Sequence, residues 1–237
     1  MEVVAQPDAE AVAEEAAKRF AKVVRKVAKR GGVSGDGIAR IVLTGGGPGI
    51  AMLRKLVNHD IDWERVHVFF GDERNVPVTD PESNEGQARE ALLEHVDIPE
   101  ANIHGYGLGG VDLNAAAENY EAVLADFAPD GFDLHLLGMG GEGHINSLFP
   151  HTPAVKEKEH LVVAVTDSPK PPAERVTLTL PAVHRAKRVW IVTAGTAKAE
   201  AIKAVVDGKK AVDWPAAGAT GTKETLLIVD KEAASLL

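Results

Sequence analysis

The chain contains no cysteine among its 237 residues. This absence excludes disulfide bonds, zinc sites built on thiolates and a cysteine nucleophile, and it fits a protein of the reducing cytoplasm. The first twenty residues contain five acidic residues and no long apolar run, so no secretory signal peptide is expected. No stretch approaches the roughly 18 apolar residues that a membrane span requires, so no membrane association is expected either.

Positive charge is also scarce, because 26 lysines and arginines face 35 aspartates and glutamates, for a formal net charge of −9. A general nucleic-acid-binding protein normally presents a basic face, so this balance argues against a nucleic-acid partner. If the ligand is an anion, the positive charge that binds it must be gathered locally in a site. The length and the absence of a linker predict one α/β domain, residues 1–237.

What the chain does contain is a glycine-rich stretch, GMGGEGHINSLFP at residues 138–150, directly after an apolar run of strand length. Glycine lets the backbone approach a ligand closely, and a turn between a strand and a helix aims free N–H groups at an anion. His144 can exchange a proton near neutral pH. The stretch therefore predicts anion-stabilising donors, from Gly138, Gly140 and Gly143, beside a general base.

Two other interpretations of this stretch remain open. His144 could simply cap a short helix, since polar residues collect at helix ends. The spacing G-x-G-x-x-G also matches a dinucleotide-binding fingerprint, and Asp167 supplies an acidic residue after the next apolar run. That fingerprint needs a long helix directly behind it, whereas Pro150 and Pro153 restrict any helix to little more than one turn. A nicotinamide cofactor is therefore not expected.

Another strand, residues 38–43, runs into a glycine turn that leads to a helix at residues 50–58. The turn begins with Thr44, Gly45, Gly46 and Gly47. A glycine turn at a helix N-terminus is typical of a phosphate-binding site, although an ordinary tight turn without a ligand would contain the same residues. It is not a Walker loop, because no G-K-[ST] follows.

Charged residues follow further strands. Asp72, Glu73 and Arg74 lie directly beyond strand 65–70. At the carboxyl end of a strand a fixed arginine can bind an anion, and a carboxylate can bind a hydroxyl group. Alternatively, the triplet is a charged loop exposed to solvent. A proline-rich connector joins strands 161–166 and 175–180. The rigid prolines can hold Lys170 and Arg175 in place. Alternatively, the segment is a stiff connector at the edge of the sheet, and both cations are exposed to solvent.

Lys198 follows strand 188–193 and lies in the first turn of the helix expected at residues 197–206. A cation there opposes the helix dipole, so an anion bound at the turn would relieve the conflict. Lys198 is therefore a candidate ligand for an anion.

Strands and helices alternate along the whole chain. Further helices are expected at residues 7–30, 85–94 and 112–127, and a last strand at 225–229 leads to a short terminal helix capped by Asp230. This pattern predicts an α/β fold with three Rossmann-like layers, a mostly parallel sheet with helices on both faces. Right-handed crossovers would bring the turns at residues 44–49, 72–74, 138–144 and 195–198 to one edge.

The motifs are similar, in order, to those of a known family. Residues 43–47 resemble the family's L-S-G-G-S turn, and residues 71–74 together with 83–84 resemble its D-E-R…S-N element. Residues 137–150 resemble its signature L-G-M-G-x-D-G-H-x-A-S-L-F-P. Residues 170–179 and 195–199 resemble its P-K-P-P…R-[IV]-T-L-T and G-x-x-K-A segments. The chain thus resembles the 6-phosphogluconolactonases, of the superfamily that includes glucosamine-6-phosphate isomerase.

Three positions depart from the family pattern. Glu142 stands where the signature has aspartate, Asn146 where alanine is frequent, and Gly47-Pro48-Gly49 replaces S-T-P. The related deaminases continue their histidine loop into F-N-E-P, and residues 147–150 lack that acidic residue. The lactonase interpretation is therefore preferred over a deaminase, another sugar-phosphate isomerase or a non-catalytic sugar-phosphate sensor.

The resemblance implies hydrolysis of 6-phospho-D-glucono-1,5-lactone without a metal or cofactor. In this interpretation His144 is the base, and Asp72 or Glu142 orients it or a sugar hydroxyl. Arg74 or the N–H groups of the glycine loop stabilise the oxyanion. Residues that bind the substrate or its phosphate are expected to be Thr44, Gly45, Gly46, Gly47, Lys170, Arg175 and Lys198, with Arg74 an alternative. A phosphorylated sugar lactone is the expected partner, and a monomer or weak homo-oligomer the expected assembly.

Overall fold

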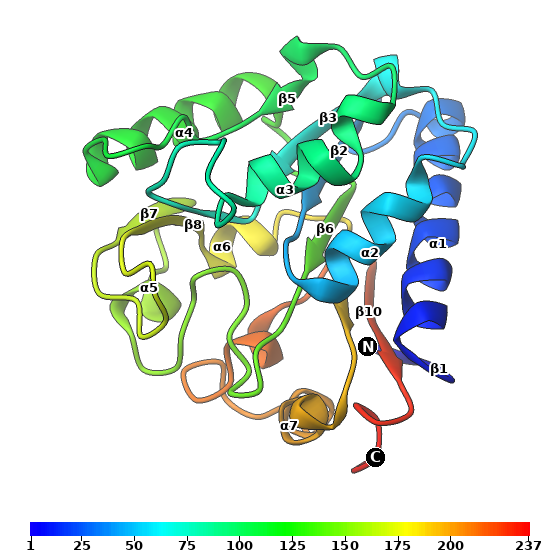
Figure 1. Cartoon of the computed structure of the whole chain (residues 1–237), viewed down its shortest axis with the longest axis vertical. Coiled ribbons are helices and arrows are strands. Elements are labelled where there is room, and N and C mark those ends of the chain that lie inside the picture. The colour runs from blue at the N-terminus through cyan, green and yellow to red at the C-terminus, as the bar shows by residue number, and fades with distance from the viewer.

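The computed structural model describes residues 1–237 and contains a seven-stranded sheet in which every neighbouring pair is parallel (Figure 1). In spatial order its strands are β1 (Glu2–Gln6), β10 (Glu224–Asp230), β9 (Arg188–Thr193), β6 (Leu134–Leu137), β2 (Ala39–Leu43), β3 (Val66–Phe70) and β5 (Ile103–His104). The inner strands β2, β6 and β9 are buried almost throughout, as expected of a parallel sheet that is covered on both faces.

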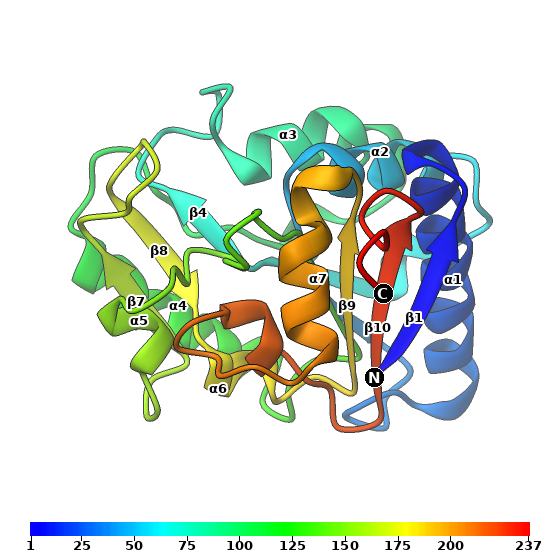
Figure 2. The ribbon, with the colours of Figure 1, turned by 90° about the horizontal axis from the view of Figure 1, so that it is seen from below.

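Helices cover both faces of this sheet. They are α1 (Ala9–Arg30), α2 (Gly47–Leu56), α3 (Asn84–Ala91), α4 (Leu113–Phe127), α5 (Pro153–Lys156), α6 (Leu180–Val183) and α7 (Ala199–Val206). Helices α1 and α2 pack against each other on one side, and α7 lies on the other side of β9 and β10 (Figure 2). The expected three-layer α/β fold is confirmed.

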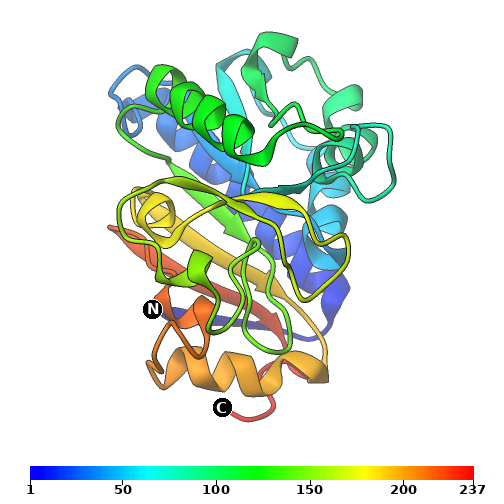
Figure 3. The same ribbon diagram turned by 90° about the vertical axis from the view of Figure 1, so that its left-hand side faces the viewer.

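A second sheet, which the sequence did not predict, is antiparallel and runs in the order β4 (Asp72–Arg74), β8 (Arg175–Leu178), β7 (Val162–Val165). It lies on the opposite side of the large sheet from α1 (Figure 3). The D-E-R triplet is therefore a strand and not a charged loop. Its register places Arg74 opposite Arg175, which brings two distant motifs together.

The structure corrects three other expectations. No helix begins directly at the glycine-rich stretch, because residues 138–149 form loops and turns in which Gly140 N–H donates to the carbonyl of His144 at 2.9 Å, and the single-turn helix α5 begins only at Pro153. The terminal helix is absent, since residues 231–236 form turns. Asp230 instead accepts hydrogen bonds from the N–H groups of Gly195 and Ala233. Strand β1, at the edge of the sheet, was not predicted.

Helix α1 shows why the predicted elements form where they do. The Asp8 side chain accepts a hydrogen bond from Ala11 N–H at 2.8 Å and caps its first turn, and Gly31 ends it with φ of 92°. Its apolar stripe, including Phe20 and Val24, joins a single cluster of 65 buried apolar residues. Neither α1 nor any other helix is long and apolar enough to cross a membrane.

Candidate active site

The predicted turns meet in a cleft of about 200 Å³ beyond the carboxyl ends of the parallel strands. The residues that line it are Thr44, Gly45, Gly46, Asp72, Arg74, Asn84, Gly138, Met139, Gly140, His144, Asn146, Lys170, Arg175 and Lys198. Their convergence confirms the expectation drawn from strand order. Gly47, Glu142 and Gly143 do not line the cleft. Four cationic side chains and one carboxylate, that of Asp72, face the same small volume, which suits an anionic ligand.

The N-terminus of α2 opens onto this cleft without a cap. Gly46 occupies the N-cap position with φ of 79°, no side chain caps the helix, and its first turn has no acidic residue. The N–H groups of Gly45 and Gly46 make no hydrogen bond within the chain. Free N–H groups and the positive end of the helix dipole together form an anion site. Gly47 is the first residue of α2.

Strand β4 separates the D-E-R triplet into two roles. Asp72 and Arg74 line the cleft, whereas Glu73, between them, points to the other side and is buried. The Glu73 carboxylate accepts hydrogen bonds from the N–H groups of Asn84 and Glu85 and from Ser83 Oγ, at 2.8 to 2.9 Å. It therefore anchors the start of α3 and not a ligand.

The carboxylate of Asp72 connects the two arginines of the cleft, Arg74 and Arg175. Its Oδ1 accepts from Asn84 Nδ2 at 2.9 Å, and Asn84 Oδ1 in turn accepts from Arg74. Its Oδ2 accepts from Ser147 Oγ at 2.6 Å and lies 3.8 Å from Nη1 of Arg175. Asp72 makes no hydrogen bond to His144, so the alternative that it orients the base finds no contact here.

Arg175 is buried and holds the proline-rich connector. Its guanidinium donates to the carbonyls of Lys170 and Pro172 at 2.8 and 2.9 Å. Nη1 also donates to Ser147 Oγ at 3.4 Å. The connector therefore keeps its place through Arg175, and Lys170 is held over the cleft. Of the two cations expected on this connector, Arg175 is buried, whereas the side chain of Lys170 is exposed.

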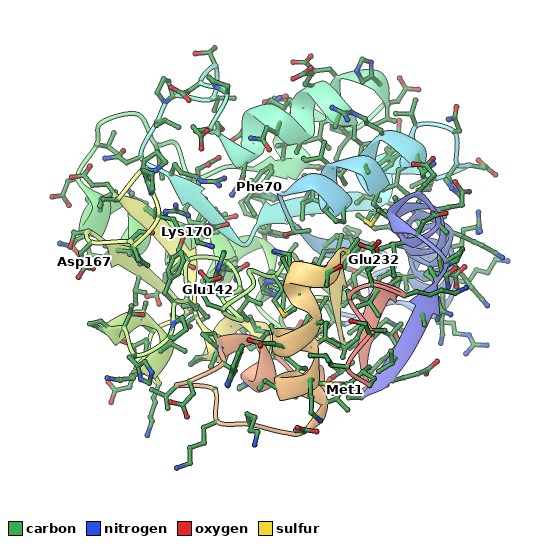
Figure 4. All side chains as sticks on the ribbon, turned by 60° about the horizontal axis from the view of Figure 1, so that its bottom comes forward. Met1, Phe70, Glu142, Asp167, Lys170 and Glu232 are labelled. Atoms are coloured by element: carbon green, nitrogen blue, oxygen red, sulfur yellow. The ribbon has the colours of Figure 1, made fainter.

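His144 is held by Glu142 and lies near Lys170. Its Nδ1 lies 3.0 Å from Glu142 Oε1 and 3.4 Å from Lys170 Nζ, and Lys170 lies 2.8 Å from the same carboxylate oxygen. Figure 4 shows Glu142 and Lys170 next to each other. The imidazole also stacks on Phe149, with ring centroids 4.5 Å apart. Of the two candidate orienting carboxylates, only Glu142 contacts the base.

The pKa values of this group favour a neutral histidine beside a charged carboxylate. Burial lowers the pKa of His144 below 6.5, the positive charge of Lys170 lowers it further, and Glu142 partly opposes both. Burial raises the pKa of Glu142, but the hydrogen bond from Lys170 and the neighbouring charges outweigh it and lower that pKa to about 2. At neutral pH the imidazole is therefore unprotonated, and Nδ1–H can donate to an anionic Glu142.

The glycine loop gives His144 room, but the N–H groups of Gly138, Gly140 and Gly143 are used within the protein. A Cβ on Gly140 would lie 2.0 Å from Nδ1 of His144 and 2.5 Å from Glu142. The N–H groups of Gly138, Gly140 and Gly143 already donate to Thr44 Oγ1, to the carbonyl of His144 and to that of Gly140. The three N–H groups expected to stabilise an oxyanion are therefore occupied.

Lys198 reaches the cleft from the far side, directly before α7. Burial lowers its pKa, the charge of Lys170 lowers it further, and Glu142 opposes both. Lys198 thus belongs to the electrostatic neighbourhood of the Glu142–Lys170 pair. No three histidine, aspartate or glutamate side chains come together in a way that could hold a metal ion.

Three residues of the cleft were not among the predicted site residues: Met139, Asn146 and Asn84, although the D-E-R…S-N motif had pointed to Asn84. Asn146 has φ of 47°, a left-handed conformation that asparagine tolerates better than most residues. Its Nδ2 is buried without a hydrogen-bond partner. The replacement of the usual alanine by Asn146 was the one signal in the sequence that pointed to this position.

Known proteins resemble this chain over most of its length. The family model described as glucosamine-6-phosphate isomerases/6-phosphogluconolactonase matches residues 7–228. A protein of Mycobacterium tuberculosis named 6-phosphogluconolactonase is 50% identical over 98% of this chain and 96% of its own length.

Two solved structures share the fold. A 6-phosphogluconolactonase from Thermotoga maritima is 26% identical, with a TM-score of 0.83 over 97% of this chain and 99% of its own. A monomeric glucosamine-6-phosphate deaminase, 23% identical, has a TM-score of 0.84 over the full length of both chains. The fold alone thus does not separate the two activities. With the family model matching most of its length, the chain belongs to the glucosamine-6-phosphate isomerase/6-phosphogluconolactonase family.

Proposed function

We propose that this chain hydrolyses 6-phospho-D-glucono-1,5-lactone to 6-phosphogluconate, a step of the oxidative pentose phosphate pathway. The observation that carries the proposal is the base: His144, kept neutral by burial, is anchored through Nδ1 to anionic Glu142 at the edge of a cationic cleft. The relatives that bear the name 6-phosphogluconolactonase cover nearly the whole chain, which supports the same substrate.

The base acts on water. With Nδ1–H donating to Glu142, Nε2 of His144 carries the free lone pair and takes a proton from the water that attacks the lactone carbonyl. A bond forms between the water oxygen and the carbonyl carbon, and the bond from that carbon to the ring oxygen breaks. His144 returns its proton to the ring oxygen. The new carboxylic acid ionises and releases one proton to solvent, so turnover can be followed by acidification.

The anionic parts of the substrate meet two groups of donors. The phosphate is held by the free N–H groups of Gly45 and Gly46 at the start of α2, together with Arg74. Arg74 lies near the start of α2 because its hydrogen-bond partner, Asn84, packs against Gly45. The contact is so close that a Cβ added to Gly45 would lie 2.5 Å from Asn84 Oδ1. Negative charge that develops on the carbonyl oxygen is stabilised by Lys170 and Lys198, the cations near Glu142.

The test is proton release after freshly generated lactone is added at neutral pH, compared with the spontaneous rate. The wild type should accelerate release, and His144→Ala should lose about 10²–10⁴-fold in kcat with little change in KM. Arg74→Ala should mainly raise KM. Unchanged acceleration in His144→Ala would refute the role of the base. No acceleration by the wild type, with ammonia or ketose formed from an amino-sugar phosphate, would replace the lactonase proposal by the deaminase or isomerase alternative.

A further inference from the structure

A second cationic region lies away from the candidate site, along the outer side of α1. From residue 16 to residue 30 the helix contains seven lysines and arginines and no acidic residue, in a chain whose net charge is −9. Lys187, which precedes β9, and Lys223, which precedes β10, lie beside the carboxyl end of α1. We call this region the basic face. It consists of Lys18, Lys22, Arg25, Lys26, Lys29, Arg30, Lys187, Arg188 and Lys223.

Most of these charges have no partner in the protein. Lys18, Lys22, Lys26, Lys29, Arg30 and Lys223 form no ion pair and no side-chain hydrogen bond. The first three and Arg30 recur every four residues, so they stand as neighbours in one row, an arrangement of like charges that is unfavourable on a helix. The helix dipole favours cations only in the last turn. It therefore accounts for Lys29 and Arg30, but not for Lys18, Lys22 and Lys26.

The basic face is hollowed and lacks apolar anchors. Three adjoining hollows of about 370, 430 and 250 Å³ lie along it, and Lys26 lines all three. The first is also lined by Glu15 and Glu224, which pair with Arg19 and Arg188, and the third by Asp133. The only apolar residues in their walls, Val23, Val27 and Trp190, are buried. The apolar stripe of α1 is likewise packed in the core, so the helix cannot insert into a bilayer or dock into a partner's apolar groove.

These features narrow the class of ligand. The row from Lys18 to Arg30 spans about 18 Å at 1.5 Å per residue, so a single phosphate would leave most of it unpaired. The walls of these hollows contain no exposed aromatic ring that could stack on nucleobases, because Trp190 is buried. Protein interfaces favour arginine and aromatic anchors and are depleted in lysine, which predominates here. Lysine binds phosphate groups as a point charge, without the planar geometry of arginine.

We propose that the basic face binds a linear polyphosphate chain, which lies along α1 with successive phosphates near successive lysines. The face and the cleft are at opposite ends of β9: Arg188 opens that strand, and Lys198 follows its other end. In Figure 4 the side chains of α1 project from the opposite side of the molecule to Glu142 and Lys170. A bound chain therefore does not touch the cleft, and the inference does not depend on the activity proposed for it.

The experiment measures binding of sodium polyphosphate by calorimetry, with inorganic phosphate as the monomeric reference. The test variant changes Lys18, Lys22, Lys26 and Arg30 to Gln, which keeps helix propensity. The matched control changes exposed Lys156, Lys158, Lys209 and Lys210 to Gln, so both variants lose four positive charges. Circular dichroism and the rate of lactone hydrolysis, which should equal those of the wild type, verify that both variants fold.

We expect the wild type and the control to bind polyphosphate alike and much more tightly than inorganic phosphate. The test variant should bind at least about tenfold more weakly, and the dependence of its affinity on salt should be shallower, because fewer counterions are released. Equal binding by the test variant, or an equal loss in the control, would overturn the proposal. Tighter binding of duplex DNA, polyglutamate or anionic vesicles would also overturn it, in favour of a different partner.

Discussion

Single side chains of the cleft have functions that their positions in the sequence do not separate. Asp72, Glu73 and Arg74 are consecutive, yet Glu73 caps a helix from the interior while its two neighbours face the ligand site. Glu142, two residues before His144, contacts the base, whereas Asp72 contacts the network around Arg175. A carboxylate becomes an orienting group through its distance to the base, and here that distance selects Glu142.

Replacing Glu142 by Gln should lower the plateau of kcat/KM by part of the ~10²–10⁴-fold that a positioned base contributes. Because the base acts when neutral, activity rises with pH through the pKa of His144, which lies below 6.5. Glu142 raises that pKa, so its loss should move the acid limb of the pH profile to lower pH. Glu142→Asp serves as the charge-preserving control. A limb that moves to higher pH would contradict this assignment.

Gly140 is required for the geometry of the base. An alanine there would bring Cβ within 2.0 Å of His144 Nδ1, so Gly140→Ala should displace the His144–Glu142 pair and lower kcat by roughly tenfold or more. Gly138 offers a matched control in the same loop, because its added Cβ would lie 3.4 Å from Thr44 Oγ1, an ordinary contact. Steady-state kinetics of both variants checks the prediction, and equal activities would show that the loop adapts.

At the scale of elements, the start of α3 and strand β4 are coupled through one buried carboxylate. Glu73 lies on β4 and accepts hydrogen bonds from the first N–H groups of α3, while Asn84 of α3 returns two hydrogen bonds to Asp72 of β4. The helix thus positions the strand that carries Asp72 and Arg74. A disturbance at Glu73, outside the cleft, should therefore reach the ligand site.

Glu73→Gln should lower the free energy of unfolding by about 1–3 kcal/mol, because one amide oxygen replaces two carboxylate oxygens as acceptors for buried donors. Chemical denaturation at neutral pH measures this change. Ser83→Ala, which removes the N-cap hydroxyl of the same helix, should cost about 1 kcal/mol. A raised KM in Glu73→Gln would show the coupling to Arg74, and a stability equal to that of the wild type would disprove the anchoring role.

Local signals predicted the parallel layers and the edge where the turns meet, because strand length and glycine turns depend on only a few neighbouring residues. The antiparallel sheet depends on pairing between Asp72–Arg74 and residues about one hundred positions later, and three charged residues have no strand propensity of their own. The occupied N–H groups of the glycine loop were equally hidden, since the sequence does not show where a donor points.

At the scale of the molecule, a net charge of −9 describes a sum and not a distribution. Four cations surround the cleft, and nine more form the basic face at the other end of β9. The expectation that no nucleic acid binds was drawn from the sum. Local charge decides such contacts, because at physiological salt the field of an exposed charge is screened within about 8 Å.

Buried histidines connect the stability of the whole fold to pH. Burial, and then the neighbouring His67 ring nitrogen at 2.9 Å, lowers the pKa of His104 to about 4. Burial alone lowers the pKa of His135 to about 3. A histidine whose pKa is lower in the folded protein contributes stability that is complete above its unfolded pKa of 6.5 and is lost as pH falls toward the folded value. Acid should therefore destabilise this fold well before its carboxylates are protonated.

His135 allows this prediction to be tested without breaking a hydrogen bond, because both of its ring nitrogens are buried and unpaired on strand β6. His135→Leu should be at least as stable as the wild type at pH 7, since no polar atom is then left without a partner. Between pH 6.5 and about pH 4 it should lose about 3 kcal/mol less stability than the wild type, the amount linked to one proton over that range. Urea unfolding at a series of pH values measures both curves, with exposed His160→Leu as a control for the substitution itself. Parallel curves for His135→Leu and the wild type would mean that acid acts on this fold through other groups.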